Sequence, residues 1–323
     1  MDQIINLLAN EEVIDVDEES FLLFAQDIPS NNLGMINPRA PAVEISINGN
    51  EYTIHQSPSL LSSHRAGGTT GAVLWKITPL FAEWITNLSN PLWTNAILSH
   101  TSTVAELGTG ISALVALVLA SSVRHYIATD QEYVRKLFRT NLDANASVSV
   151  SSSDNKSRAK GKSKGFKSSK SKSSSTARPL DNISFTTLDW ETDQAASLKE
   201  CMDPDEAHGQ YEEDKGEEDK GFDLLLSCDC VYNEALVAPF VRTCAEICRL
   251  RPAYVAGSDE SRPRRSPTVC IIAQQQRSPD VFEAWLRETM REFRVWRLSD
   301  DVLGEGLKSG SGYLVHLLLV RDK

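Results

Sequence analysis

A glycine-rich loop is the first segment of this chain whose residues could perform chemistry. It consists of Glu106-Leu107-Gly108-Thr109-Gly110 and separates a predicted strand, residues 103–107, from an almost wholly apolar predicted helix, residues 112–120. Glycine lets a backbone approach a ligand closely, and the first turn of a helix offers unpaired N–H groups. The segment therefore predicts a ligand-binding loop, although a tight strand-to-helix turn without a ligand would use the same residues.

Two ligands are compatible with this loop. Gly108-x-Gly110-x-x-Ala113 matches the dinucleotide pattern, and Asp130 follows about 20 residues later, where it could accept from a ribose hydroxyl. Glu106 opposes a dinucleotide, because its carboxylate would repel a pyrophosphate. The sulfonium and ammonium of S-adenosylmethionine would instead attract it. We therefore predict S-adenosylmethionine as the cofactor, bound by Glu106, Gly108, Gly110 and Asp130.

Acidic residues recur where later strands end. Asp189-Trp190 follows a third predicted strand, and Cys228-Asp229 ends a fourth. In an open parallel sheet, ligands bind at the carboxyl ends of the strands. Asp189 could accept from an adenine amino group while the Trp190 ring covers the base, so we expect both residues and Cys228 to contact the cofactor. One acid thus ends each of four consecutive predicted strands: Glu106, Asp130, Asp189 and Asp229.

Strands and helices alternate from residue 103 onward, which predicts a mainly parallel sheet. The predicted strands cover residues 103–107, 124–130, 183–188, 222–227, 269–273, 293–298 and 313–320. The predicted helices cover residues 112–120, 133–142, 235–250 and 279–292. The last two strands follow each other without a helix and should pair antiparallel. We predict a Rossmann-like α/β fold, with a seven-stranded, mostly parallel sheet and an antiparallel last strand.

Two units are predicted from the remaining sequence. Residues 1–66 are expected to form an N-terminal extension, acidic and partly helical at first, and then a β-hairpin around the turn Asn48-Gly49-Asn50. Residues 67–323 are expected to form the main domain. It would open with a helix whose apolar stripe runs from Leu74 to Leu88 and packs in the core.

Two insertions interrupt the main domain. Residues 146–178 are rich in Ser and Lys, with Asp154 as the only acid, and residues 200–220 are strongly acidic. A Ser/Lys tract cannot bury a core, so we expect it to be disordered. It could bind RNA or direct nuclear import, but we interpret it as a solvated linker. Apart from this tract, the formal net charge of -11 argues against nucleic-acid binding.

These motifs together resemble methyltransferase family 16, the seven-β-strand protein-lysine methyltransferases that use S-adenosylmethionine. The resemblance covers roughly residues 67–145 and 180–320, with Ser112 in place of a third loop glycine. Residues 69–84 are most similar to fungal members of this family that act on a large-subunit ribosomal protein. The matching pieces are Gly71–Trp75, Val104–Gly110, Asp130, Asn141, Leu188–Trp190 and the D-x-x-Y element Asp229–Tyr232.

The resemblance implies protein-lysine N-methylation, with a ribosomal protein as partner. A neutral amine must then lie about 3 Å from the methyl carbon, in line with the breaking bond. We expect Asp229 and Tyr232 to be the catalytic residues that orient this amine, and Trp75 to form an aromatic wall beside the cofactor. Two alternatives remain open: a methyltransferase-like interaction module without activity, and a methyltransferase with a non-lysine acceptor.

Other classes of protein receive less support. The spacing of the six cysteines fits no strong zinc pattern, so we expect no metal site. No signal peptide opens the chain, and no apolar run is long enough to span a membrane. We expect a monomer that works in the cytoplasm, and also in the nucleus if the basic tract directs import.

Overall fold

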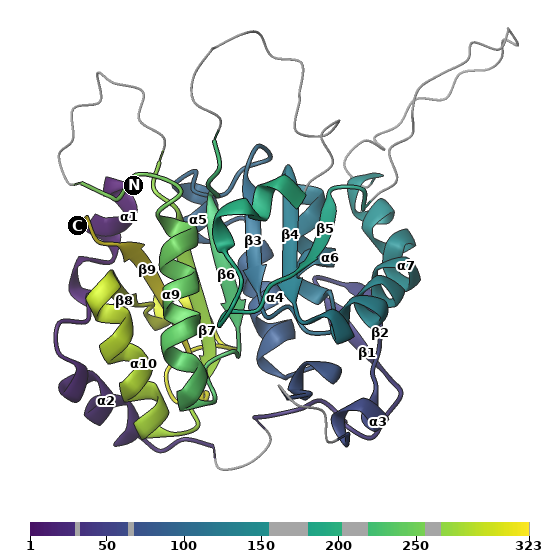
Figure 1. Ribbon diagram of the computed structural model, residues 1–323, viewed down its shortest axis with the longest axis horizontal. Helices are drawn as coiled ribbons and strands as arrows, with labels where there is room; N and C mark the ends of the chain where they lie inside the picture. The colour runs from purple at the N-terminus through teal and green to yellow at the C-terminus, as the bar shows by residue number, and fades with distance from the viewer. Residues whose placement is uncertain (30–32, 64–67, 155–179, 202–218, 256–265, 323) are drawn as a thin grey trace, which may run out of the picture.

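The computed structural model describes residues 1–29, 33–63, 68–154, 180–201, 219–255 and 266–322. Its centre is a seven-stranded sheet with the order β5-β4-β3-β6-β7-β9-β8 (Figure 1). Neighbouring strands from β5 to β7 are parallel, whereas β9 runs antiparallel to both of its neighbours. The predicted fold class is therefore confirmed. The strands are β3 (Thr103–Leu107), β4 (His125–Asp130), β5 (Ile183–Thr187), β6 (Leu224–Cys228), β7 (Val269–Gln275), β8 (Phe293–Arg297) and β9 (Tyr313–Val320).

Helices cover both faces of this sheet, which explains why strands such as β3 are apolar along their length. One core lies beneath α4 (Ile77–Thr86), α6 (Leu114–Leu119) and α7 (Glu132–Asp154), and the other beneath α9 (Val237–Cys248) and α10 (Pro279–Glu292). None of the described helices is both long and apolar enough to cross a membrane. The other helices are α1 (Asp2–Leu7), α2 (Val16–Phe24), α3 (Pro58–Leu61), α5 (Pro91–Thr94) and α11 (Asp300–Leu303). Segments of 3-10 helix cover Ala9–Glu11, Thr70–Ala72, Ala120–Ser122, Ala195–Cys201 and Glu234–Leu236.

The predicted hairpin forms and is anchored to α7. It consists of β1 (Ala42–Ile47) and β2 (Asn50–His55), joined by a turn in which Asn48 and Gly49 both have positive φ. The buried Asn141 side chain accepts from His55 N at 2.7 Å and donates to the carbonyl of Ile111, just past the glycine loop. Asn141 thus connects the hairpin to the segment that follows the glycine loop.

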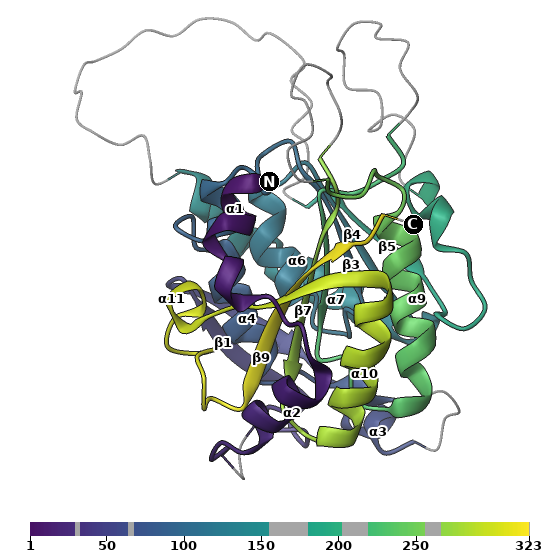
Figure 2. The ribbon, with the colours of Figure 1, turned by 90° about the vertical axis from the view of Figure 1, so that its left-hand side faces the viewer.

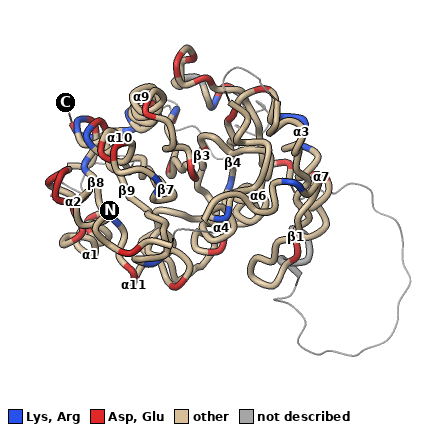
Figure 3. The backbone as a smooth tube through the Cα atoms, turned by 90° about the horizontal axis from the view of Figure 1, so that it is seen from below, with Lys and Arg blue, Asp and Glu red and all other residues tan. Residues whose placement is uncertain are grey.

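The N-terminal segment covers the exposed edge of the sheet. Val13 N donates to Val295 O at 2.8 Å, so the segment pairs with the edge strand β8. Two ion pairs reinforce this contact, Arg294 with Glu12 and Arg297 with Glu19. Figure 2 shows α1 and α2 beside the β8–α10 side of the molecule, and Figure 3 shows acidic and basic residues meeting there.

The largest differences from the predicted elements are at α7, at α4 and between β8 and β9. Helix α7 runs to Asp154 and not to residue 142, because no Gly or Pro interrupts it and Val148 still packs against the core. The start of the segment predicted as disordered is therefore helical, and its remainder from residue 155 lies outside the described residues, as do residues 202–218 of the acidic insertion. Leu88 is 60% exposed, since α4 already ends at Thr86. The short helix α11 lies between β8 and β9, where none was expected.

Candidate functional site

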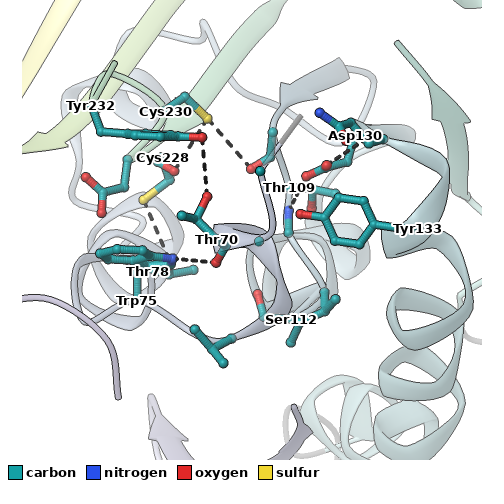
Figure 4. Close-up of a pocket in the computed structure, with 18 of the residues that line it drawn as sticks. Thr70, Trp75, Thr78, Thr109, Ser112, Asp130, Tyr133, Cys228, Cys230 and Tyr232 are labelled. Atoms are coloured by element: carbon teal, nitrogen blue, oxygen red, sulfur yellow. Dashed lines mark hydrogen bonds between the residues drawn. The ribbon is translucent and has the colours of Figure 1, made fainter. Parts of the chain in front are cut away.

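A cavity lies at the carboxyl ends of β3, β4 and β6, roofed by the 3-10 turn at Thr70–Ala72 (Figure 4). Its empty space is about 1080 Å³, part of which is open to solvent. All the predicted site residues except Glu106 line it: Trp75, Gly108, Gly110, Asp130, Asp189, Trp190, Cys228, Asp229 and Tyr232.

The glycine loop has no room for a side chain at Gly108. Gly108 has a φ of 67°, and a Cβ on it would lie 2.3 Å from the Cys230 sulfur. Gly110 has a φ of 62°, and a Cβ there would lie 3.4 Å from the carbonyl oxygen of Gly71. Glycine is therefore required at Gly108 by backbone conformation and by packing. Ser112, which replaces the third glycine, is buried, and its hydroxyl accepts from Leu114 N at the start of α6.

The roof of the cavity is tied to the loop through its backbone. Gly71 O accepts from Ile111 N at 2.9 Å, directly after the second loop glycine. Trp75 Nε1 donates to Thr70 O at 3.0 Å, and the Thr70 hydroxyl donates to the Tyr232 hydroxyl at 3.3 Å. The tryptophan-bearing segment identified in the sequence therefore faces the D-x-x-Y element across the cavity, as Figure 4 shows for Thr70, Trp75 and Tyr232.

Asp130 orders the loop from the end of the adjacent strand. Its carboxylate accepts from Gly110 N at 2.8 Å and from Gln131 N at 2.7 Å. Burial raises the pKa of this carboxyl to about 6, and the two backbone N–H groups oppose the rise. Because Asp130 also lines the cavity, its remaining lone pairs can accept from a ligand hydroxyl.

Glu106 does not line the cavity, which corrects the expectation of direct contact with a ligand. Its side chain is 2% exposed and lies beneath the loop, where it accepts from the hydroxyls of Thr109 and Tyr126, each at 2.7 Å. Burial raises the pKa of its carboxyl to about 7. Thr109 does line the cavity, so Glu106 can influence a ligand only through this hydroxyl or through its charge.

An aromatic wall stands beside the loop. A Cβ on Gly108 would lie 3.5 Å from the Trp190 ring, and this ring packs edge-on against Phe240 at a centroid distance of 5.0 Å. Asp189 is exposed at the cavity rim, where its carboxylate accepts from Glu191 N. This wall suits a flat ring, with a carboxylate next to it.

The opposite end of the cavity contains an ion pair that the sequence analysis missed. The Asp229 carboxylate accepts from both terminal nitrogens of Arg277, at 2.8 Å for Nη1, and from Gln275 N at 3.1 Å. The Arg277 guanidinium also lies 4.7 Å from the Trp75 ring centroid. Arg277 follows β7, which pairs with β6, so the strand-end argument that identified Asp229 would also have identified it.

The last two predicted residues lie at the same end. Cys228 is half-buried, its thiol lies 3.9 Å from the Thr78 hydroxyl, and burial raises its pKa well above the usual range. It is therefore a packing group and not a nucleophile. Tyr232 is 38% exposed, with its hydroxyl at the cavity mouth, and burial of its ring raises the pKa of that hydroxyl. No group of potential metal ligands occurs within the described ranges.

The strand order, the glycine loop after β3 and the cavity at the strand ends define a Rossmann-like α/β fold with a ligand-sized opening at the carboxyl ends of its strands. The chain is similar to proteins named ribosomal lysine N-methyltransferase 5, which confirms the predicted resemblance. The Zygosaccharomyces rouxii protein is 27% identical over 256 residues, covering 76% of this chain and 72% of that protein. The Kluyveromyces lactis protein is 25% identical over 312 residues, covering 85% and 88% respectively.

One similar protein has a different name and matches only part of this chain. A diaminohydroxyphosphoribosylamino-pyrimidine deaminase from Schizosaccharomyces pombe is 34% identical over 134 residues, which are 41% of this chain and 32% of that protein. This chain spans only about a third of that relative. Zinc deaminases use an H-x-E and a P-C-x-x-C motif, and this sequence contains neither. The match therefore gives no support for deaminase chemistry here.

Two further comparisons add little. No protein-family model matches the chain. Among solved structures, a putative methyltransferase from Streptococcus mutans superimposes with a TM-score of 0.43 at 11% identity, over 87% of this chain and 56% of that one. A superposition with so low a score carries no information about ligand or chemistry. The fold class therefore rests on the strand order.

Proposed function

We propose that this protein is an S-adenosylmethionine-dependent protein-lysine N-methyltransferase that acts on a ribosomal protein, one of the large subunit. The observation that carries the proposal is the arrangement of the cavity, in which Asp130 lies on one side and Trp75, Cys228 and Tyr232 lie on the other (Figure 4). The loop glycines, Trp190 and Asp229 complete the lining. The names of the similar fungal proteins support the substrate class.

The residues at the glycine-loop end fit the cofactor. A Cβ on Gly108 would enter the space between Cys230 and Trp190, so the loop keeps a backbone surface free for a ligand. Asp130 would accept from the ribose hydroxyls, and Trp190 would cover the adenine beside Asp189. The bound cofactor would supply an electrophilic methyl group on its sulfonium. Glu106 would hold the loop through Thr109 rather than touch the cofactor.

The residues at the end that contains Asp229 and Tyr232 fit a lysine side chain. Trp75 and Tyr232 offer aromatic surfaces that attract a cation, and the positive charge passes to the amine as the methyl group is transferred. Asp229 would orient the amine through Oδ2, which among the described residues accepts from Arg277 alone, whereas Oδ1 accepts from Arg277 and from Gln275 N. Because an amine is a nucleophile only when it is neutral, a lysine with its ordinary pKa near 10.4 must lose a proton before transfer.

The proposal is tested with labelled S-adenosylmethionine and a ribosomal protein fraction. We expect label on a lysine of one large-subunit protein, and calorimetric binding of S-adenosylmethionine but not of NAD. The variant Gly108→Arg should lose both signals, whereas Leu88→Arg, on an exposed position away from the cavity, should keep them.

Each alternative has its own result. Label on arginine, glutamine or a small molecule, and never on lysine, would show that the protein is a methyltransferase with a different acceptor. Binding of neither S-adenosylmethionine nor its product would indicate an interaction module without activity. Tight binding of NAD in its place would show that the dinucleotide interpretation of the loop was the better one.

A further inference from the structure

Asp229 is held in a single orientation by groups that follow β7. Its side chain is 3% exposed, and its backbone has a φ of 63°, which is uncommon for a residue with a side chain. Both carboxylate oxygens accept from Arg277, and Gln275 N donates to Oδ1 as well. Asp229 N donates to Ala273 O at 2.7 Å. So many bonds leave the carboxylate little freedom to turn toward a substrate.

Arg277 joins this carboxylate to Trp75. Its guanidinium lies over the Trp75 ring, and Trp75 and Asp229 both line the cavity. Arg277 does not line this cavity, although it lines a smaller neighbouring one together with Tyr232. The charge of Arg277 therefore acts on the end of the cavity that contains Asp229 and Tyr232, which we call the acceptor end. Its hydrogen bonds to the site go to Asp229.

The thiols and phenols next to Asp229 do not supply a charge at neutral pH. Burial raises the pKa of the Cys228 and Cys230 thiols and of the Tyr232 hydroxyl. The Tyr313 hydroxyl, on β9, has its pKa raised to about 12, and it donates to Leu33 O. The carboxyls of Glu106 and Asp130, whose pKa values burial raises to about 7 and about 6, belong to the glycine-loop end. The charge at the acceptor end is thus set by the ion pair.

From this geometry, and on the basis of the proposed function, we propose that Arg277 is a positioning residue that decides which protonation state of the substrate amine the acceptor end favours. With Arg277 in place, the carboxylate already has its counter-ion, so a lysine ammonium gains little by entering. The neutral amine, which is the reactive form, is then the one that binds productively.

Removal of Arg277 should reverse this preference. An unpaired, buried carboxylate would pair with the incoming ammonium, and an opposite charge at such a distance stabilises the charged form by roughly one to three pH units. In Arg277→Met, the substrate would remain protonated to higher pH. The variant would therefore bind substrate well but transfer methyl groups slowly until the pH rises.

The experiment is the pH profile of kcat for the full-length protein, with the large-subunit protein that becomes labelled as the substrate. We expect the rising limb of this profile to move upward by roughly one to three pH units in Arg277→Met, with KM unchanged or lower. Arg277→Lys keeps a cation and should keep the position of the limb. The double variant Asp229→Asn/Arg277→Met has neither charge and should return the limb to the wild-type position, at a lower rate. Arg287→Met, which removes an arginine from a surface ion pair, is the matched control.

Two results would overturn the inference. One is a fall in kcat by the same factor at every pH, which would mean that Arg277 only supports the structure. The other is a shifted limb that persists in the double variant, which would mean that Asp229 does not mediate the effect. Calorimetric cofactor binding shows that each variant is folded. Failure of the proposed function would be seen separately, as absence of lysine label with the wild type.

Discussion

The two ends of the cavity are built in different ways. At the glycine-loop end, the constraint is the backbone: two glycines with positive φ, Asp130 accepting from Gly110 N, and the Gly71 carbonyl on Ile111 N. At the acceptor end, the constraint is a network of side chains, in which Arg277 joins Asp229 to Trp75. A backbone cradle can bind one invariant ligand, whereas a side-chain network can adjust charge and shape to a particular acceptor.

The largest effect should come from removing the acceptor carboxylate. Asp229→Ala is expected to lower the rate of methyl transfer by roughly a hundred- to a thousand-fold, because a preorganised polar contact is lost in the transition state. Cofactor affinity should change by only a few-fold, since the glycine-loop end is intact. Transfer rates and calorimetry on the same preparation check this, with Asp143→Ala on the exposed side of α7 as the control. Transfer at the wild-type rate would remove Asp229 from the site.

The complementary change acts on the glycine-loop end. In Gly108→Ala the new methyl group meets the Cys230 sulfur, and overpacking of this kind typically costs about 1–3 kcal/mol. Because the loop lines the cavity, we expect it to relieve the clash by moving into the ligand space, so that affinity for S-adenosylmethionine falls by roughly ten- to a hundred-fold. Gly304→Ala is the matched control, because Gly304 also has a positive φ of 73° but no atom within 4 Å of a Cβ. Gly108→Ala/Cys230→Ala should recover part of the affinity. No recovery would show that the backbone conformation alone requires glycine.

The buried Glu106 carboxyl beneath the glycine loop should make the stability of the protein depend on pH. Its folded-state pKa, about 7, is above its ordinary value of 4.5, so the folded state favours the protonated form. The stability that this provides is present below pH 4.5 and is lost as the pH rises through 7, by at most about 3 kcal/mol. Glu106→Gln should flatten this part of the profile in urea unfolding between pH 4.5 and 8. An unchanged slope would contradict the assignment.

His316 contributes with the opposite sign and must be separated from Glu106. It is fully buried beside Trp285, neither ring nitrogen has a hydrogen-bond partner among the described residues, and burial lowers its pKa to about 3. Its contribution is present above pH 6.5 and is lost as the pH falls toward 3. His316→Leu should therefore make the protein less sensitive to acid. The unfolding free energies of the two single variants at pH 5 and pH 8 distinguish the two effects.

The smallest effect is expected from the segment between α7 and β5. Replacing residues 155–179 by a short Gly/Ser linker should change the unfolding free energy by less than about 1 kcal/mol, because loop closure depends weakly on length. Residues up to Val148 must be retained, since that side chain packs against the core. Cofactor affinity and lysine transfer, measured beside stability, should be unchanged. A loss of several kcal/mol would mean that the tract belongs to the folded domain.

Periodicity and strand-end chemistry were sufficient to predict much of this molecule. The β3, α10 and β9 boundaries agree with the predicted ones, because continuous apolar runs bounded by turn residues leave few alternatives. The residues of the glycine-loop end are adjacent in the chain or lie at neighbouring strand ends, so the order of strands and helices suffices to bring Gly108, Asp130 and Trp190 together.

Other features depended on the tertiary structure. The sequence places Glu106 beside the loop, but strand geometry and the hydroxyls of Thr109 and Tyr126 decide that its carboxylate lies under the loop and not in the cavity. Arg277 and Trp75 are far apart in the chain and belong to no shared motif. Only the pairing of β6 with β7, and the fold of the roof over both, brings a cation between Asp229 and an aromatic ring. Charge compensation of this kind is a property of distances in space, and for that reason local patterns along the sequence do not reveal it.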